Sequence, residues 1–258
     1  MDIKLVDEFQ LDWHLEGKSK QTAKNYAFDL RKFLRDFSNP SLADAKTWIL
    51  QTDSNVGRRK RAQAIRAFGC WLADQEIEEL KWYKQLPLTK EKTLPQQTVI
   101  LADYEKALAL AKTVRDKAII EVLWSCGLRR KELTELRVED VDFQGGFIVV
   151  RKSKTGSPRV APMSPSARRA IRKLLKGRSE GQLFKISPNG VRLMLKRINA
   201  PSAHAWRRGW TVQALRSGVS ETSVRAAAGW SSGAMVSRYT RALSGELAIQ
   251  EFQRSWTV

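Results

Sequence analysis

Hydrophobic residues in the first third of the chain recur at the three- and four-residue spacing of amphipathic helices. The stripes consist of Val6, Phe9 and Trp13, then Tyr26, Leu30, Phe33 and Phe37, then Leu42, Trp48 and Ile49, and finally Ile65, Phe68 and Leu72. Gly17 and Pro40 separate the first helices, since glycine favours helix ends and proline cannot continue a helix. Asp53-Ser54 precedes the fourth helix, where an N-cap is expected. We therefore predict a small all-helical domain over residues 1–85.

Residues 86–97 interrupt this pattern. They contain two prolines around a charged middle and have no periodic hydrophobic face, which is typical of a linker. Helical periodicity returns at about 102–112 and 115–125, and the second of these helices is apolar enough to be buried. We therefore predict a second domain over residues 98–258.

The pattern then changes from the period of a helix to that of a β-strand. Phe147–Arg151 is a run of mostly β-branched and apolar residues, Lys152–Ser157 has the composition of a turn, and Arg159–Ala161 reads as the returning strand. The Ser-Pro pairs at 164–165 and 187–188 each predict an N-cap followed by proline in the first helical turn. The expected fold is mainly α, with a small antiparallel β-sheet or hairpin in the C-terminal domain.

The charge of the chain is strongly positive and unevenly distributed. The 258 residues include 46 Lys and Arg against 27 Asp and Glu, a net charge of +19 at pH 7. Residues 91–258 hold 30 of the basic and 14 of the acidic side chains. Such a surplus favours a polyanionic partner, because cations that neutralise phosphates release condensed counterions. Arg58, Arg59 and Arg61 begin a predicted helix, where cations are disfavoured unless a phosphate lies nearby, so we expect them to contact DNA.

Several other functional classes find little support in the sequence. The longest apolar runs fall short of the roughly 18 residues of a membrane span, and the first residues lack the regions of a signal peptide. Cys70 and Cys126 form neither a disulfide framework nor a metal motif. With no phosphate-binding glycine loop and no paired-histidine zinc motif, neither a nucleotide cofactor nor zinc is implied. We expect a cytoplasmic protein associated with the nucleoid.

The stretch from His204 to Tyr239 gathers residue types that bind phosphate. Ser202 is placed to begin a helix on which His204 and Arg207, three residues apart, share one face. Gly218 is expected to end this helix and Gly229 the next, and a last short helix carries Tyr239. Each residue alone has an ordinary explanation: a lone histidine is usually packed or at the surface, an arginine pair is usually solvated, and a helical tyrosine usually belongs to the core.

Five motifs in this half of the chain occur together in one order. They are Gly127-Leu128-Arg129-Arg130-Lys131-Glu132-Leu133, Ser153-Lys154-Thr155-Gly156, His204-Ala205-Trp206-Arg207, Gly229-Trp230-Ser231-Ser232 and Arg238-Tyr239-Thr240. In this order and spacing they resemble the tyrosine recombinases of the phage integrase family. The resemblance covers most of the chain and implies a minimal member without an arm-binding domain. It also implies that a core-binding domain and a catalytic domain form a C-shaped clamp on duplex DNA.

The resemblance further implies which residues act in catalysis. The implied catalytic residues are Arg129, Lys154, His204, Arg207, Trp230 and Tyr239, with Glu132 in a supporting role. Two arginines suit a reacting phosphodiester, since guanidinium groups are permanently charged and bind phosphate oxygens in a bidentate manner. Tyr239 would form a 3′-phosphotyrosyl intermediate with help from His204. Lys154 at the hairpin tip would protonate the leaving 5′ oxygen, and Lys152 beside it is a further candidate for DNA contact.

The implied reaction is site-specific recombination of double-stranded DNA through a Holliday junction, without metal or ATP. A homotetramer on two DNA sites would catalyse it. Ile249, Phe252 and Trp256 fall on one helical face. Such a face ordinarily docks on the chain's own domain, whereas the resemblance implies that this C-terminal tail docks on the next copy.

The sequence departs from the family pattern at two places, and alternatives remain open. Trp230 stands where the family often has a second histidine, and it can donate a hydrogen bond but not shuttle a proton. Trp206 and Arg208 replace a leucine and a histidine of the commonest motif. The alternatives are a type IB topoisomerase-like or telomere-resolving enzyme, and a non-catalytic DNA-binding protein. A metal-dependent nuclease would need converging carboxylates, and the acidic residues of this half are scattered.

Overall fold

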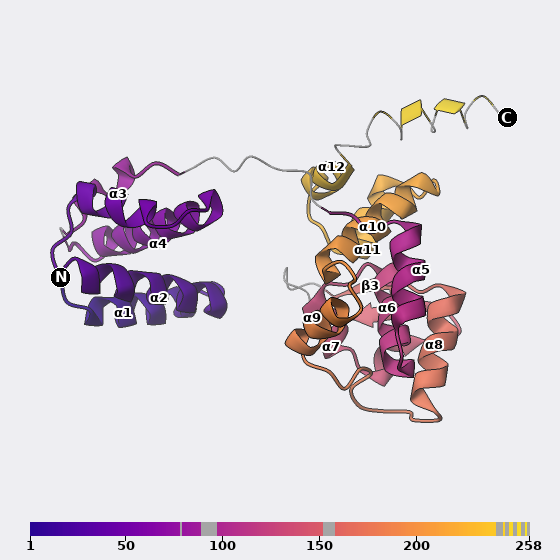
Figure 1. The fold of residues 1–258 in the computed structure, drawn as a ribbon. Coiled ribbons are helices and arrows are strands. Elements are labelled where there is room, and N and C mark those ends of the chain that lie inside the picture. Colours follow the sequence, from indigo (N-terminus) through magenta and orange to yellow (C-terminus); the bar gives the residue numbers. More distant parts are fainter. Residues whose placement is uncertain are drawn as a thin grey trace. The chain divides into compact units, whose positions relative to one another are not determined.

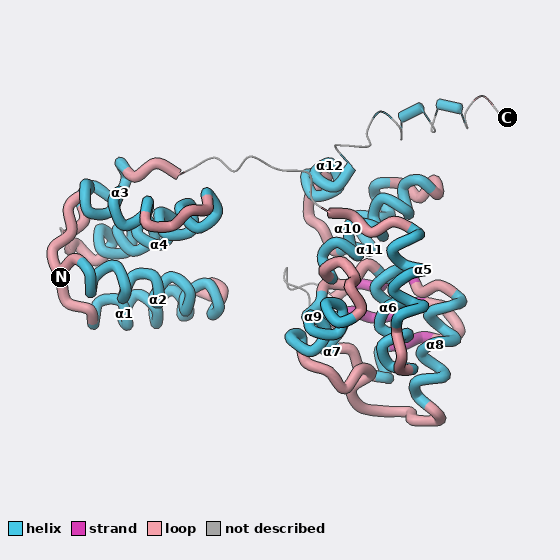
Figure 2. The backbone as a smooth tube through the Cα atoms, viewed as in Figure 1, coloured by secondary structure: helices cyan, strands magenta, loops and turns pink. Residues whose placement is uncertain are grey.

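The computed structural model describes residues 1–77, 79–88, 97–151 and 158–240, and, in the C-terminal tail, residues 245, 248–249, 252–253 and 256. The chain divides into two compact units, Met1–Leu94 and Pro95–Val258. Helices dominate both units, and the described strands lie in the second unit (Figures 1 and 2). The fold is thus mainly α with a small antiparallel sheet, as predicted.

The first unit contains the four predicted helices and a short 3-10 helix. They are α1 (Lys4–Leu15), α2 (Lys20–Asp36), α3 (Leu42–Leu50), α4 (Asn55–Asp74) and η1 (Lys81–Gln85). Ser19, Ser41 and Ser54 cap α2, α3 and α4, because each side chain accepts a hydrogen bond from a backbone N–H of the first turn. The starts of these three helices are therefore set by local serine chemistry.

Aromatic side chains fill the core of the first unit. The ring of Phe9 meets those of Phe68 and Trp71 at 5.4 and 5.9 Å between centroids, edge to face. The core extends past the expected domain end at residue 85. Leu86 is buried in it, and the Leu86 carbonyl accepts a hydrogen bond from Arg66 Nη1 at 3.2 Å. The start of the predicted linker is thus part of the packed unit, and residues 89–96 lie outside the described structure.

The second unit contains the remaining elements. They are α5 (Leu101–Leu110), α6 (Val114–Cys126), α7 (Arg130–Glu135), η2 (Val138–Asp140), β1 (Val141–Asp142), β2 (Phe147–Val150), β3 (Arg159–Pro162), α8 (Pro165–Leu175), α9 (Pro188–Arg197), α10 (Ala203–Arg216), α11 (Glu221–Ala228) and α12 (Ala234–Thr240). Ser164 and Ser187 cap α8 and α9, each followed by proline, as predicted.

The sheet has the order β1-β2-β3, and both strand pairs are antiparallel. The predicted hairpin is the β2–β3 pair, in which Val150 lies opposite Arg159. The sequence pattern missed β1, which is only two residues long and pairs with β2 across the turn that joins them. In that turn Gly146 has φ +71°, which glycine adopts without steric cost. Residues 152–157, the predicted hairpin tip, lie outside the described structure.

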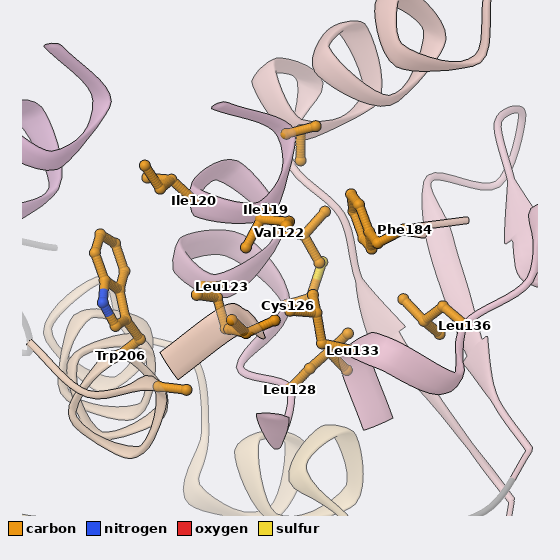
Figure 3. Close-up of a cluster of buried hydrophobic side chains, with 14 of the residues drawn as sticks. Ile119, Ile120, Val122, Leu123, Cys126, Leu128, Leu133, Leu136, Phe184 and Trp206 are labelled. Atoms are coloured by element: carbon orange, nitrogen blue, oxygen red, sulfur yellow. The ribbon is translucent and has the colours of Figure 1, made fainter. Parts of the chain in front are cut away.

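Helix α6 is the centre of the second unit. It packs against α5, α8, α10 and β3, and Val122, Leu123 and Cys126 are fully buried. Figure 3 shows the α6 side chains between Phe184 and Leu136 on one side and Trp206 of α10 on the other. This burial on several sides explains why the helix is mostly apolar after its charged first turn. Because α6 ends where the Arg129 motif begins, its packing fixes the position of that motif relative to α10.

None of the helices in the described part of the chain is long and apolar enough to cross a membrane.

Candidate active site

Helix α10 carries two of the predicted site residues. Ser202 is its N-cap residue, and the Ser202 carbonyl accepts from the Ala205 N–H at 2.8 Å. Gly209 brings the helix close to the segment that follows the linker, since a Cβ there would lie 2.4 Å from the Val99 carbonyl oxygen. The His204 side chain is partly exposed, whereas Arg207, one turn later, is 1% exposed. The helix thus presents an imidazole at the edge of the site and a guanidinium at its base.

Main-chain carbonyls hold the Arg207 guanidinium in place. Nη1 donates to the Gly127 carbonyl at 2.6 Å, and Nη2 donates to the Ala228 carbonyl at 2.5 Å. The guanidinium carbon also lies 4.9 Å from the centre of the Trp230 ring. Burial, and next the neighbouring Arg129, lower the pKa of Arg207 to about 9, so the group is still charged at neutral pH. Arg207 therefore joins the end of α6 to the end of α11.

Arg129 and Glu132 form the second part of the site. Gly127 ends α6 in the left-handed conformation with φ +57°, and Arg129 is the N-cap residue of α7. Glu132, in the first turn of α7, accepts from the Arg129 backbone N–H at 2.7 Å and from Arg129 Nη1 at 2.6 Å. This carboxylate thus holds both the main chain and the side chain of Arg129.

Glu132 is buried and remains ionised because of its partners. Arg159 Nη2 donates to Glu132 Oε2 at 2.9 Å, and Arg207 Nη1 lies 3.9 Å from the same oxygen. Desolvation by burial acts to raise the pKa of Glu132, but the hydrogen bonds from Arg159 and Arg129 outweigh it, and the net pKa is lowered. One carboxylate therefore connects Arg129, Arg159 and Arg207.

Tyr239 lies at the same site on α12. Its hydroxyl and His204 Nε2 are 3.0 Å apart and share a hydrogen bond. Its ring meets the Trp230 ring at 5.3 Å between centroids and 68° between planes. Tyr239 is 7% exposed and Trp230 is 9% exposed. Trp230 thus packs between the tyrosine and Arg207.

The electrostatics of His204 favour a neutral imidazole. Desolvation by burial lowers the pKa of His204 from its usual value of 6.5, and the charges of Arg208, Arg207 and Arg129 lower it further. A neutral imidazole has one ring nitrogen free to accept a proton. Nε2 at 3.0 Å from the Tyr239 hydroxyl is within the reach of a general base.

The structure brings together six of the predicted residues in the second unit. They are Arg129, Glu132, His204, Arg207, Trp230 and Tyr239. Lys152 and Lys154 lie outside the described residues. Arg58, Arg59 and Arg61 belong to the first unit. Of these, Arg58 donates to the Thr52 carbonyl and Arg61 to the Trp48 carbonyl, so their DNA contacts stay predictions.

Two arginines at the site were not selected from the sequence. Arg159 holds Glu132 from β3, and Arg208 follows Arg207 and donates to the Gln97 carbonyl at 2.8 Å. A signal for Arg159 exists, since the alternation of the strand places it on the same side as the apolar Ala161. Through the described part of the chain, no group of three or more His, Cys, Asp or Glu side chains could hold a metal ion.

Comparisons with known proteins agree with this arrangement. The sequence model described as the phage integrase family matches residues 97–246. The chain is 30% identical over 236 residues to the tyrosine recombinase XerA of Pyrococcus horikoshii, which covers 83% of this chain and 81% of the relative. It is 27% identical over 284 residues to the tyrosine recombinase XerC of Myxococcus xanthus, which covers 92% of each.

A solved structure of similar fold is that of a lambda integrase tetramer bound to a Holliday junction. Its TM-score is 0.76 at 13% identity, over 92% of this chain and 76% of the other. The family match spans more than half of the chain and contains the site built around Arg129, Arg207 and Tyr239. This chain therefore belongs to the phage integrase family and is a site-specific tyrosine recombinase.

Proposed function

We propose that Tyr239 cleaves one DNA strand by attacking a phosphodiester, and that Arg129 and Arg207 neutralise the reacting phosphate. The tyrosine oxygen forms a bond to phosphorus as the bond from phosphorus to the 5′ oxygen breaks. The phenol proton passes to His204 Nε2, and the leaving 5′ oxygen takes a proton. The products are a 3′-phosphotyrosyl link and a free 5′-hydroxyl. Attack by the 5′-hydroxyl of another strand reverses these bonds and completes the exchange.

The hydrogen bond between the Tyr239 hydroxyl and His204 Nε2, at 3.0 Å, carries this proposal. An unperturbed phenol has a pKa of about 10, so attack at neutral pH needs a base that is itself unprotonated. The lowered pKa of His204 supplies one. The nearby guanidiniums favour the extra negative charge that forms on the phosphate oxygens. Lys154 is proposed as the acid for the leaving oxygen from the family resemblance alone.

A nicked duplex tests this mechanism directly. If the nick lies just beyond the cleavage site, the released short strand diffuses away and the covalent enzyme accumulates. We expect a protein–DNA adduct with wild type, in the presence of a chelator, and none with Tyr239→Phe. Tyr104→Phe is the matched control, because the Tyr104 hydroxyl also donates to a side chain, Glu121 Oε1, at 3.1 Å. An adduct that persists in Tyr239→Phe would refute the proposal.

We further propose that the chain acts on double-stranded DNA as a tetramer on two sites, associated with the nucleoid. The structurally similar lambda integrase is a tetramer bound to a Holliday junction, and the net charge of +19 suits DNA. The proposed DNA-binding roles of the first unit and of Arg58, Arg59 and Arg61 belong to this assembly. An assay that detects strands joined between two differently labelled sites distinguishes recombination from cleavage and resealing within a single site.

Exchange of the C-terminal tail is the proposed contact between copies. Ile249, Phe252 and Trp256 are 60%, 62% and 76% exposed. The second unit also has an open pocket of about 1030 Å³, lined by apolar residues such as Trp210 and Val224. Burying the three side chains in this pocket of the next copy would remove apolar surface from water. Phe252→Ser with Trp256→Ser should then weaken tetramers on DNA while adduct formation at single sites persists; unchanged tetramers would exclude this contact.

A further inference from the structure

Arg159 has an unusual position for a charged residue. Along β3, Arg159 and Ala161 face the interior, whereas Val160 is 55% exposed. The Arg159 side chain itself is only 5% exposed. A buried charge is costly unless it is paired and hydrogen-bonded. An inward arginine on a four-residue strand therefore calls for a partner, and the partners are parts of the active site.

The Arg159 guanidinium joins two segments that carry site residues. Nη2 donates to Glu132 Oε2 at 2.9 Å, and Nε donates to the Ala227 carbonyl at 2.8 Å. Glu132 holds Arg129. Ala227 precedes Ala228, whose carbonyl accepts from Arg207 at 2.5 Å. Arg159 is thus linked to Arg129 through the Glu132 side chain, and to Arg207 through the adjacent carbonyls of Ala227 and Ala228. Both of these arginines face the phosphate in the proposed mechanism.

Close packing adds to these hydrogen bonds. A Cβ on Gly229 would lie 2.7 Å from Arg159 Cδ, so the aliphatic stem of the arginine lies directly against the turn between α11 and Trp230. Gly229 has φ +65°, a conformation that favours glycine. The turn that presents Trp230 therefore rests on the Arg159 side chain.

We propose that Arg159 is a positioning residue for strand cleavage, which sets the spacing of Arg129 and Arg207 by tying Glu132 to the end of α11. This inference rests on the proposed function of the two arginines as phosphate ligands. Lysine is a poor replacement for Arg159, because a single ammonium lacks the planar fork whose two nitrogens reach two acceptors at once. Catalytic groups displaced by about 1 Å lose roughly 10²-fold in rate.

The test compares Arg159→Lys and Arg159→Met with wild type. The rate of adduct formation on the nicked duplex is measured under single-turnover conditions, together with the affinity for uncleaved DNA and the melting temperature. We expect Arg159→Lys to bind DNA as wild type does and to cleave roughly 10²-fold more slowly, and Arg159→Met to be slower still. Arg178→Lys is the matched control, because Arg178 also donates to two acceptors, the carbonyls of Gln182 and Leu183, and it should keep the wild-type rate.

A second substrate separates positioning from a general structural effect. A methylphosphonate at the scissile position is neutral, so it lacks the charge that Arg129 and Arg207 neutralise. If Arg159 acts through these two arginines, the rate difference between Arg159→Lys and wild type becomes much smaller on this substrate. An equal difference on both substrates, or a wild-type rate for Arg159→Lys on the normal duplex, would overturn the inference. Failure of the proposed function looks different, since wild type itself would then form no Tyr239-dependent adduct.

Discussion

Replacing Glu132 with glutamine should destabilise the second unit strongly, because one carboxylate compensates several cations. Glu132 accepts from Arg129 at 2.6 and 2.7 Å and from Arg159 at 2.9 Å, and its side chain is 3% exposed. A glutamine keeps one acceptor oxygen, but its amide N–H groups face another donor. The positive charges of the Arg129 and Arg159 guanidiniums then lack the carboxylate that compensates them. Removing one partner of a buried ion pair costs about 3–5 kcal/mol. At about 2–4 °C per kcal/mol for a unit of this size, the melting temperature falls by roughly 6–20 °C.

Glu135→Gln is the matched control on the same helix. Glu135 pairs with Lys131 at 3.6 Å, and the two side chains are 44% and 79% exposed. Exposed pairs of this kind contribute about 0.3–0.5 kcal/mol, so the control should melt close to wild type. Calorimetry on the full chain measures both variants, and hydrogen exchange in α6 and α10 assigns the transition to the second unit.

The effect of Glu132→Gln should also depend on pH. The pKa of Glu132 is lowered in the folded protein, so the native state favours the ionised form. The stability that this carboxylate contributes is fully present above the unfolded pKa of about 4.3. It is lost as the pH falls through the lower folded pKa, and the difference between wild type and Glu132→Gln narrows there. Equal stability at pH 7, or a difference that widens on acidification, would refute this account.

Three further predictions follow from the site geometry. The pKa of His204 is lowered below 6.5, first by burial and then by nearby arginines. The rate of single-turnover cleavage should therefore stay constant from pH 8 to about 6.5 and fall only below that pH. A rate that declines already above pH 7 would contradict the role of neutral His204 as the base. Arg207→Lys should reduce the cleavage rate by about 10²- to 10³-fold, because a lysine ammonium cannot donate to the Gly127 and Ala228 carbonyls with the geometry of a guanidinium. A near-normal cleavage rate at equal DNA affinity would contradict this role of Arg207. Gly127→Ala should destabilise the second unit by about 1–3 kcal/mol, since the φ of Gly127 is +57° and a Cβ would lie 2.3 Å from the Trp210 ring. The control is Gly177→Ala, because Gly177 has φ +88° but no neighbour within 4 Å. An equal loss of stability in the two variants would exclude a role for the Trp210 contact.

The sequence predicted those elements whose signals are local. Serine caps and proline breaks act within one helical turn, and the observed α4, α8 and α9 follow Ser54, Ser164 and Ser187, which cap them. The β2–β3 hairpin was predicted for the same reason, since its strands are adjacent along the chain. Strand β1 was missed because two residues carry no periodicity, and only pairing with β2 defines it. Leu86 was assigned to the linker because burial against helices distant in sequence leaves no local trace.

The site residues were predicted from motifs, but their supports were not. Arg207 binds carbonyls 80 and 21 residues away along the chain, and the main chain gives no sequence signal for such contacts. Arg159 joins acceptors 27 and 68 residues away. The inward position of Arg159 on its strand could have indicated that its charge is paired. The sequence gives no sign that the partner is Glu132. Tertiary contacts thus decide how the predicted residues are held.

The arrangement leaves positive charge in excess around Glu132. Among the described residues, the guanidiniums of Arg129, Arg159 and Arg207 lie at 2.6, 2.9 and 3.9 Å from one carboxylate. The uncompensated charge adds to desolvation in lowering the pKa values of Arg207 and His204, and Arg129 contributes to both. A phosphodiester would bring one negative charge into this excess, and nucleophilic attack would concentrate more on its oxygens. The site is therefore better compensated by the transition state than by the bound substrate, which is the condition for binding energy to accelerate the reaction.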